Sequence, residues 1–216
     1  GAVGENTKLV FICSPNNPTA NAFRKEDILH VVRSVNAMVV VDEAYVDFSS
    51  MGTLMEATRH HENLVVLQTF SKAWGMAGIR LGMAFAHPDT ITFLNRVKYP
   101  YNVNSLTLEH ASDALDKKVQ KEEWVKEILE QRECLAESLD SFGFVKNVYP
   151  SDANFLLVKV RDPLALYTFL RDSKVVVRDR SGVTLCEGAL RITVGTPEEN
   201  RSLRSLLQQY EEGDNP

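Results

Sequence analysis

The chain has 216 residues, of which 44% are hydrophobic and 25% are charged, and its formal net charge is −5. This composition is typical of a folded globular protein, and the length suffices for one large domain or two small ones. Basic residues are scattered among acidic ones, so we expect no nucleic-acid partner. No apolar run approaches the ~20 residues of a membrane helix, and the N-terminus lacks a signal pattern, so we expect a cytoplasmic protein without membrane association.

The cysteines and histidines predict neither disulfides nor a metal site. Cys13, Cys134 and Cys186 are odd in number, widely spaced and without a CxxC pair, which favours free thiols in a reducing compartment. His60 and His61 are adjacent, so they point apart on a regular element, and no third ligand is near in sequence. The chain begins without methionine and soon enters an apolar strand, so we expect it to be part of a longer protein.

Strands and helices alternate in the first half of the chain. Short apolar runs predict strands at 9–13, 38–41, 64–67 and 79–86. Apolar residues at helical spacing predict a helix around 28–35, and another is expected from Pro88 to about Val97. The order strand, helix, strand predicts a right-handed βαβ unit and hence an α/β fold with a mostly parallel sheet.

The second half has a different pattern. We expect one long helix over about 106–142, then a strand at 153–160, a helix at 163–172 and strands at 174–178 and 189–194. Thr196, Pro197 and Glu199 form a capping box that starts a last helix. These elements predict two domains, 1–110 and a smaller α+β domain over 111–216.

Polar side chains lie at the ends of the predicted strands, where α/β folds bind ligands. An aldehyde cofactor such as pyridoxal phosphate needs a lysine amine, a carboxylate for its ring nitrogen, donors for its ring oxygen and a cation for its phosphate. Each residue alone has a structural alternative, such as a capping aspartate, a core tyrosine, an Asx-turn asparagine or a surface arginine. The candidates for these needs are Lys72, Asp42, Tyr45, Asn17 and Arg80, with Arg191 further on.

Four motifs in order resemble those of fold-type I pyridoxal-phosphate aminotransferases. They are Ser14-Pro15-Asn16-Asn17-Pro18-Thr19, Asp42-Glu43-Ala44-Tyr45, Ser71-Lys72 with Arg80, and Leu190-Arg191-Ile192-Thr193-Val194-Gly195. Residues 100–104 and 191–196 resemble the histidinol-phosphate aminotransferase subfamily in particular. The resemblance covers nearly the whole chain and implies a homodimer whose large domain, incomplete here, carries the cofactor.

The resemblance also implies a role for each matching residue. Lys72 would bind the cofactor's aldehyde as an imine and move the substrate proton, and Asp42 would pair with the pyridine nitrogen. Asn17 and Tyr45 would bond the ring oxygen. Thr69, Ser71 and Arg80 would bind the cofactor phosphate, since a guanidinium offers paired charged donors. Asn17, Arg178 and Arg191 would contact the substrate. The reaction implied is transamination between histidinol phosphate and 2-oxoglutarate in histidine biosynthesis.

Two departures from the family pattern leave alternatives open. Ala20 stands where family members usually have glycine, which would strain the loop by ~1 kcal/mol if the position needs positive φ. The family's earlier segment, which supplies one wall of the cofactor site, is missing. Alternatives to transamination are a decarboxylase or lyase acting on a phosphorylated amino acid, or a catalytically silent fragment of the fold.

Overall fold

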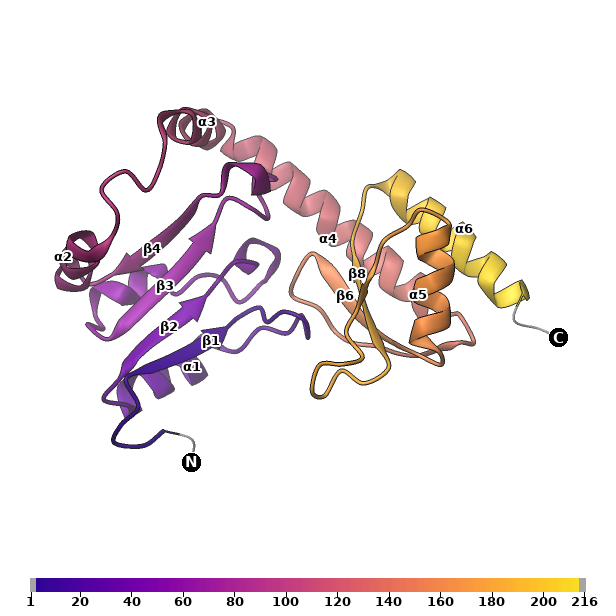
Figure 1. Cartoon of the computed structure of the whole chain (residues 1–216), viewed down its shortest axis with the longest axis horizontal. Coiled ribbons are helices and arrows are strands. Elements are labelled where there is room, and N and C mark those ends of the chain that lie inside the picture. Colours follow the sequence, from indigo (N-terminus) through magenta and orange to yellow (C-terminus); the bar gives the residue numbers. More distant parts are fainter. Residues whose placement is uncertain (1–2, 214–216) are drawn as a thin grey trace. The chain divides into compact units, whose positions relative to one another are not determined.

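The computed structural model describes residues 3–213, which form two compact units (Figure 1). Within these residues the first unit comprises 3–16 and 22–123, and the second comprises 17–21 and 124–213. Each unit has its own four-stranded sheet. The predicted domain division near residue 111 stays a prediction.

The first unit contains a mostly parallel sheet with the strand order β1-β2-β3-β4. The first three strands are parallel, and β4 is antiparallel to β3. Helix α1 connects the parallel strands β1 and β2, so the predicted βαβ unit and the α/β class are confirmed. The bounds are β1 Leu9–Cys13, α1 Lys25–Ser34, β2 Met38–Asp42, β3 Leu64–Thr69 and β4 Gly82–Ala86.

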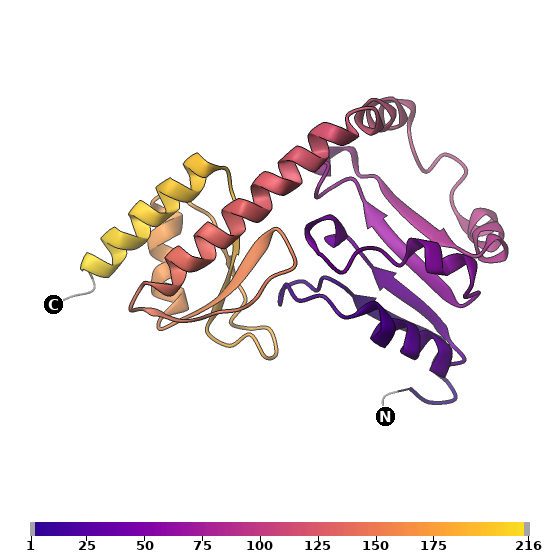
Figure 2. The ribbon, with the colours of Figure 1, turned by 180° about the vertical axis from the view of Figure 1, so that it is seen from behind.

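Alternate side chains of the first sheet face its two sides. On one side Val39, Val41, Leu64 and Val66 pack against α1, which lies across that face in Figure 2. On the other side an apolar groove of about 680 Å³ opens between the sheet and α2 (Pro88–Val97), and Phe11 there is 66% exposed. The strands that are apolar on both faces therefore have one face packed against helix α1, while the other face lines this groove.

Two predicted elements need correction, and the first unit also contains 3₁₀ turns that were not predicted. The strand expected at 79–86 starts only at Gly82, because a 3₁₀ turn, η3 (Ala77–Ile79), precedes it and Arg80 is left-handed with φ 57°. The prediction of a single long helix over about 106–142 is wrong. A turn at 116–117, where the Lys117 N–H donates to the Ala114 carbonyl, separates α3 (Ser105–Leu115) from α4 (Lys118–Asp140). Two further 3₁₀ turns are η1 (Val46–Phe48) and η2 (Met55–Arg59).

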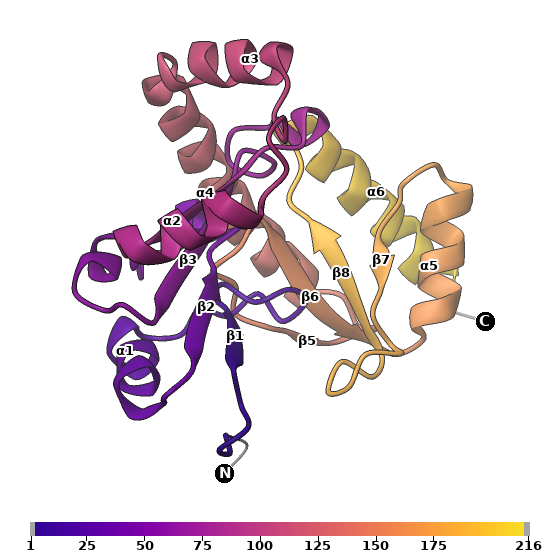
Figure 3. The same cartoon turned by 60° about the vertical axis from the view of Figure 1, so that its left-hand side comes forward.

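The second unit contains an antiparallel sheet with the order β5-β6-β8-β7. Leucines of α4, α5 and α6 pack on one face of this sheet, and Figure 3 shows α5 and α6 on the same side of it. The α+β pattern predicted for this part is present. The bounds are β5 Val145–Val148, β6 Phe155–Val160, α5 Pro163–Asp172, β7 Arg178–Asp179, β8 Ala189–Thr193 and α6 Pro197–Gly213.

The strand predicted at 174–178 is wrong except at its end. Helix α5 ends in a turn in which the Val175 N–H donates to the Leu170 carbonyl at 2.8 Å, and Lys174 is left-handed with φ 67°. This Schellman-type ending uses Lys174 at a position that favours glycine, so the sequence signal for a helix end was absent. Strand β5 was not predicted, because its exposed Lys146 and Asn147 interrupt the apolar pattern.

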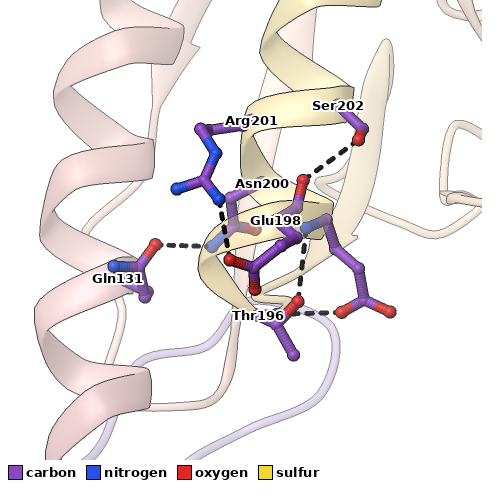
Figure 4. Close-up of polar contacts among 7 residues, drawn as sticks. Gln131, Thr196, Glu198, Asn200, Arg201 and Ser202 are labelled. Atoms are coloured by element: carbon purple, nitrogen blue, oxygen red, sulfur yellow. Dashed lines mark hydrogen bonds and ion pairs between the residues drawn. The ribbon is translucent and has the colours of Figure 1, made fainter.

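The capping box predicted before α6 is confirmed. The Glu199 N–H donates to the Thr196 hydroxyl at 3.2 Å, and the Thr196 N–H donates to the Glu199 carboxylate at 2.8 Å. Next to it, the buried Asn200 donates to Gln131 of α4 at 3.1 Å (Figure 4). The Asn200 amide also bonds the N–H and the carbonyl of Gly195, each at 3.0 Å. These bonds fix the turn that joins β8 to α6.

Among residues 3–213, none of the helices has the length and apolar character that crossing a membrane would require.

Candidate active site

Asp42 is the last residue of β2, the strand between β1 and β3. Its half-buried carboxylate accepts a hydrogen bond from the Ala44 N–H at 2.9 Å, which fixes its orientation. The neighbouring residue on β1 is Cys13, and burial together with the negative charge of Asp42 raises the pKa of its thiol. The carboxylate thus lies at the carboxyl-terminal edge of the parallel strands, the edge at which such sheets bind ligands.

Lys72 and Tyr45 meet at the same edge. Lys72 follows β3 by three residues, and Tyr45 follows β2 by three. The Lys72 Nζ atom lies 5.0 Å from the centroid of the Tyr45 ring, and Tyr45 is buried. A cation over an aromatic face is attracted by the ring quadrupole, so this contact holds the amine in place. The turn after Lys72 is closed by the Gly75 N–H, which donates to the Lys72 carbonyl at 2.9 Å.

The predicted phosphate ligands lie beside Lys72 along the chain. The Thr69 hydroxyl is 2.9 Å from the Ser71 hydroxyl, accepts the Ser71 N–H at 3.0 Å and lies 3.2 Å from the Leu81 carbonyl. Arg80 directly precedes Leu81, and its exposed guanidinium donates to the Ala77 carbonyl at 2.9 Å. The hydroxyls of Thr69 and Ser71 and the arginine therefore come from the end of β3 and the segment that connects it to β4.

Glu43 is a buried carboxylate that the sequence reasoning did not single out. It is 3% exposed and accepts hydrogen bonds from the Leu54 N–H at 2.6 Å, the Thr53 hydroxyl at 2.5 Å and the Gln68 amide at 2.9 Å. Glu43 therefore holds the segment before η2 and strand β3 against the end of β2. Its position between Asp42 and Tyr45 was visible in the sequence, but its three partners lie 10 to 25 residues away.

In the second unit the structure brings Asn17, Arg178 and Arg191 together. The Arg191 Nη1 atom donates to the Asn17 Oδ1 atom at 2.8 Å, and the guanidinium carbon lies 5.0 Å from the centroid of the Phe155 ring. Arg178 of β7 is the direct cross-strand partner of Arg191. Like charges directly opposite each other on a sheet repel, so a bound anion would stabilise this arrangement.

The predicted site residues thus form two groups. The first unit holds Asp42, Tyr45, Thr69, Ser71, Lys72 and Arg80, and the second holds Asn17, Arg178 and Arg191. Their individual roles in binding and catalysis stay predictions.

A mostly parallel sheet with a lysine and an aspartate at the carboxyl-terminal edge of its strands is found in a known family of enzymes. The sequence matches the family described as aminotransferase class I and II over residues 2–207, and the chain belongs to this family. Similar curated proteins are named histidinol-phosphate aminotransferase. That of Cytophaga hutchinsonii is 46% identical over 209 residues, which are 97% of this chain and 60% of that protein. That of Parabacteroides distasonis is 49% identical over 94% of this chain and 59% of that protein.

Solved structures show the same fold. The crystal structure of the histidinol-phosphate aminotransferase from Clostridium acetobutylicum superposes with a TM-score of 0.89 at 23% identity, covering 95% of this chain and 64% of that one. This likeness confirms the predicted fold type. The chain spans about 60% of the length of the curated relatives it matches.

Proposed function

We propose that the whole protein is a pyridoxal-phosphate-dependent aminotransferase that moves an amino group between histidinol phosphate and 2-oxoglutarate in histidine biosynthesis. The observation that carries the proposal is the Lys72 amine held over the Tyr45 ring, with Asp42 at the end of the adjacent strand. The relatives that share 44–49% identity with this chain carry the name of this enzyme, which favours the substrate.

The donor set of the first unit fits the cofactor. Lys72 would hold the cofactor covalently through Nζ, and Asp42 would accept a hydrogen bond from the ring nitrogen. Tyr45 would donate to the ring oxygen, a role that is also proposed for Asn17 of the second unit. Thr69, Ser71 and Arg80 supply the hydroxyl and guanidinium donors that a phosphate binds. The bond from Arg191 engages the Asn17 carbonyl oxygen, so the amide nitrogen of Asn17 is the atom that would donate.

When bound, pyridoxal phosphate supplies an electron sink that stabilises negative charge on the substrate's α-carbon. The negative Asp42 would favour a protonated ring nitrogen, which strengthens that effect. As a free amine, Lys72 would act as the base that takes the α-proton of the substrate. Tyr45, which contacts Lys72 through its ring, would keep that amine in position.

The two arginines of the second unit would bind the anionic group of the substrate. Arg178 and Arg191 are paired across β7 and β8, and a guanidinium pair matches the oxygens of a phosphate or carboxylate. The bond from Arg191 to Asn17 would link the substrate-binding arginine to a cofactor ligand.

The homodimer and the cytoplasmic location are also proposals. The support for the homodimer is the resemblance to the family, and the support for the cytoplasmic location is the odd number of widely spaced cysteines, which suits a reducing compartment. Sedimentation of the protein at several concentrations tests the first.

The cofactor test is chemical trapping. The chain is mixed with pyridoxal phosphate, reduced with borohydride and digested, and the modified lysine is mapped by mass spectrometry. We expect the adduct at Lys72 and its loss in Lys72→Ala, whereas Lys8→Ala, at an exposed lysine of the same unit, leaves it unchanged. An adduct spread over surface lysines but absent from Lys72 would refute the assignment.

A second step separates transamination from decarboxylation. Glutamate, histidinol phosphate or a phosphorylated amino acid is added in turn to the full-length protein with bound cofactor, and the products are measured. Formation of pyridoxamine phosphate and an oxo product supports transamination. Release of carbon dioxide from a phosphorylated amino acid, without pyridoxamine phosphate, would support the lyase alternative instead.

A further inference from the structure

Lys121, in the first turn of α4, is a lysine with an unusual environment. Its side chain is only 12% exposed, whereas that of Lys118, three residues earlier, is 71% exposed and lies 3.6 Å from Glu122 on the helix surface. Lysine is rarely buried unless its charge has a partner. The burial of Lys121 therefore points to specific contacts of its ammonium group.

The ammonium group of Lys121 contacts two segments that flank the proposed cofactor lysine. Its Nζ atom lies 2.7 Å from Asp47 Oδ1 and 5.2 Å from the centroid of the Trp74 ring. Asp47 belongs to η1 and follows Tyr45 by two residues, while Trp74 follows Lys72 by two residues. Lys121 thus joins the turn after β2 to the turn after β3.

These contacts form a closed ring of interactions that includes Lys72. The Trp74 ring lies 5.5 Å from that of the buried Phe70, which precedes Lys72 by two residues. Lys72 itself lies over Tyr45, and the chain leads from Tyr45 to Asp47. Three side-chain contacts and two short stretches of chain form this ring within the first unit, and the interaction between Lys121 and Asp47 completes it.

We propose that Lys121 is a positioning residue that fixes the Lys72 amine against Tyr45. It would act through Asp47 and Trp74 without touching the cofactor, and the proposal rests on the proposed function in so far as Lys72 is the cofactor lysine. Reactive groups must be held to within about 0.5 Å by their surroundings to work efficiently. The segments after β2 and β3, which the structure describes in full, contain no helix longer than a 3₁₀ turn, so side-chain contacts are needed to hold them in place.

The first test measures cofactor binding in three variants. Lys121→Met keeps the apolar stem and removes the charge, Lys121→Arg keeps the charge, and Lys118→Met is the exposed control. Because the charged hydrogen bond and the cation–π contact are both lost, we expect Lys121→Met to weaken formation of the Lys72 adduct about tenfold. Lys121→Arg restores most of the loss, and Lys118→Met matches the wild type. Equal binding by Lys121→Met and wild type would overturn the proposal.

The second test needs no cofactor. Hydrogen exchange is followed at the amides of Gly75 and Met76, which donate to the carbonyls of Lys72 at 2.9 Å and Phe70 at 3.0 Å. In Lys121→Met we expect these amides to exchange about tenfold faster, while those of α1 keep their rates. Unchanged rates, or rates raised equally throughout the unit, would contradict a positioning role. If the wild type forms no adduct at Lys72, the proposed function fails, yet exchange still decides whether Lys121 holds this turn.

Discussion

Removing the buried carboxylate of Glu43 should destabilise the first unit strongly. Glu43→Ala leaves the buried Leu54 N–H without its acceptor and takes away the bonds to Thr53 and Gln68. Hydrogen bonds to a charged group contribute ~1.5–3 kcal/mol each, and a buried unsatisfied N–H costs ~1–3 kcal/mol. The Gln68 side-chain amide already donates to the Thr53 hydroxyl at 3.0 Å, and this bond can offset part of the loss. We therefore expect a loss of about 3–4 kcal/mol in the free energy of unfolding.

The two tryptophans allow each unit to be measured by itself. Trp74 lies in the first unit and Trp124 in the second. In a Trp124→Phe background, tryptophan fluorescence during urea unfolding reports only on the first unit. The reference is Glu56→Ala in the same background, because Glu56 is an exposed residue whose carboxylate lies 3.3 Å from Arg59. Exposed ion pairs contribute about 0–1 kcal/mol, so this control should shift the transition little.

A second substitution, Glu43→Gln, separates the contribution of the negative charge from that of the size of the side chain. Glu43→Gln keeps the size of the side chain and can still accept from the Leu54 N–H, but it places an amide group opposite another amide, that of Gln68. We expect it to lose less than Glu43→Ala, about 1–2 kcal/mol. If Glu43→Ala cost no more than Glu56→Ala, the carboxylate would not be holding the end of β2, and the reasoning would be refuted.

Three further predictions concern the second unit. Asn200→Ala leaves both polar groups of Gly195 unsatisfied and should lower the free energy of unfolding by about 2–3 kcal/mol, measured by Trp124 fluorescence in urea. Thr196→Ala removes one half of the capping box and should cost ~1 kcal/mol in the same assay, and a cost near zero would contradict a working cap. Burial raises the pKa of the Cys186 thiol, so at a given pH less of it is thiolate and alkylation should be slower than at the exposed Cys134. Because the unfolded chain loses this proton more easily, stability should fall as pH rises past about 8.5, and Cys186→Ala should remove the part of this fall that Cys186 contributes, while Cys13, whose thiol pKa is also raised, keeps its own part.

The strand ends could be predicted from the sequence, but most side-chain partners could not. Asp42 directly follows one apolar run and Lys72 comes five residues after another, so their place at one sheet edge follows from the parallel order of the strands. The tie between Lys121 and Asp47 joins residues 74 positions apart, and no local pattern marks it. Lys174 at a helix end and Arg80 before β4 adopt positive φ where the sequence shows no glycine, so the strands predicted there were too long.

The loop after β1 shows that one residue can have two roles, so that a substitution removes both. Residues 17–21 belong to the second unit, although the residues on both sides of them belong to the first. The Asp152 N–H donates to the Ala20 carbonyl at 2.7 Å, and Ala20 has φ 66°, the positive value at which the family's glycine would be unstrained. Arg191 bonds Asn17 at the start of the same loop. A substitution of Arg191 therefore removes a proposed substrate ligand and also releases a proposed cofactor ligand. Loss of activity in such a variant therefore reports on both ligands, and a measurement of cofactor binding without substrate separates the two effects.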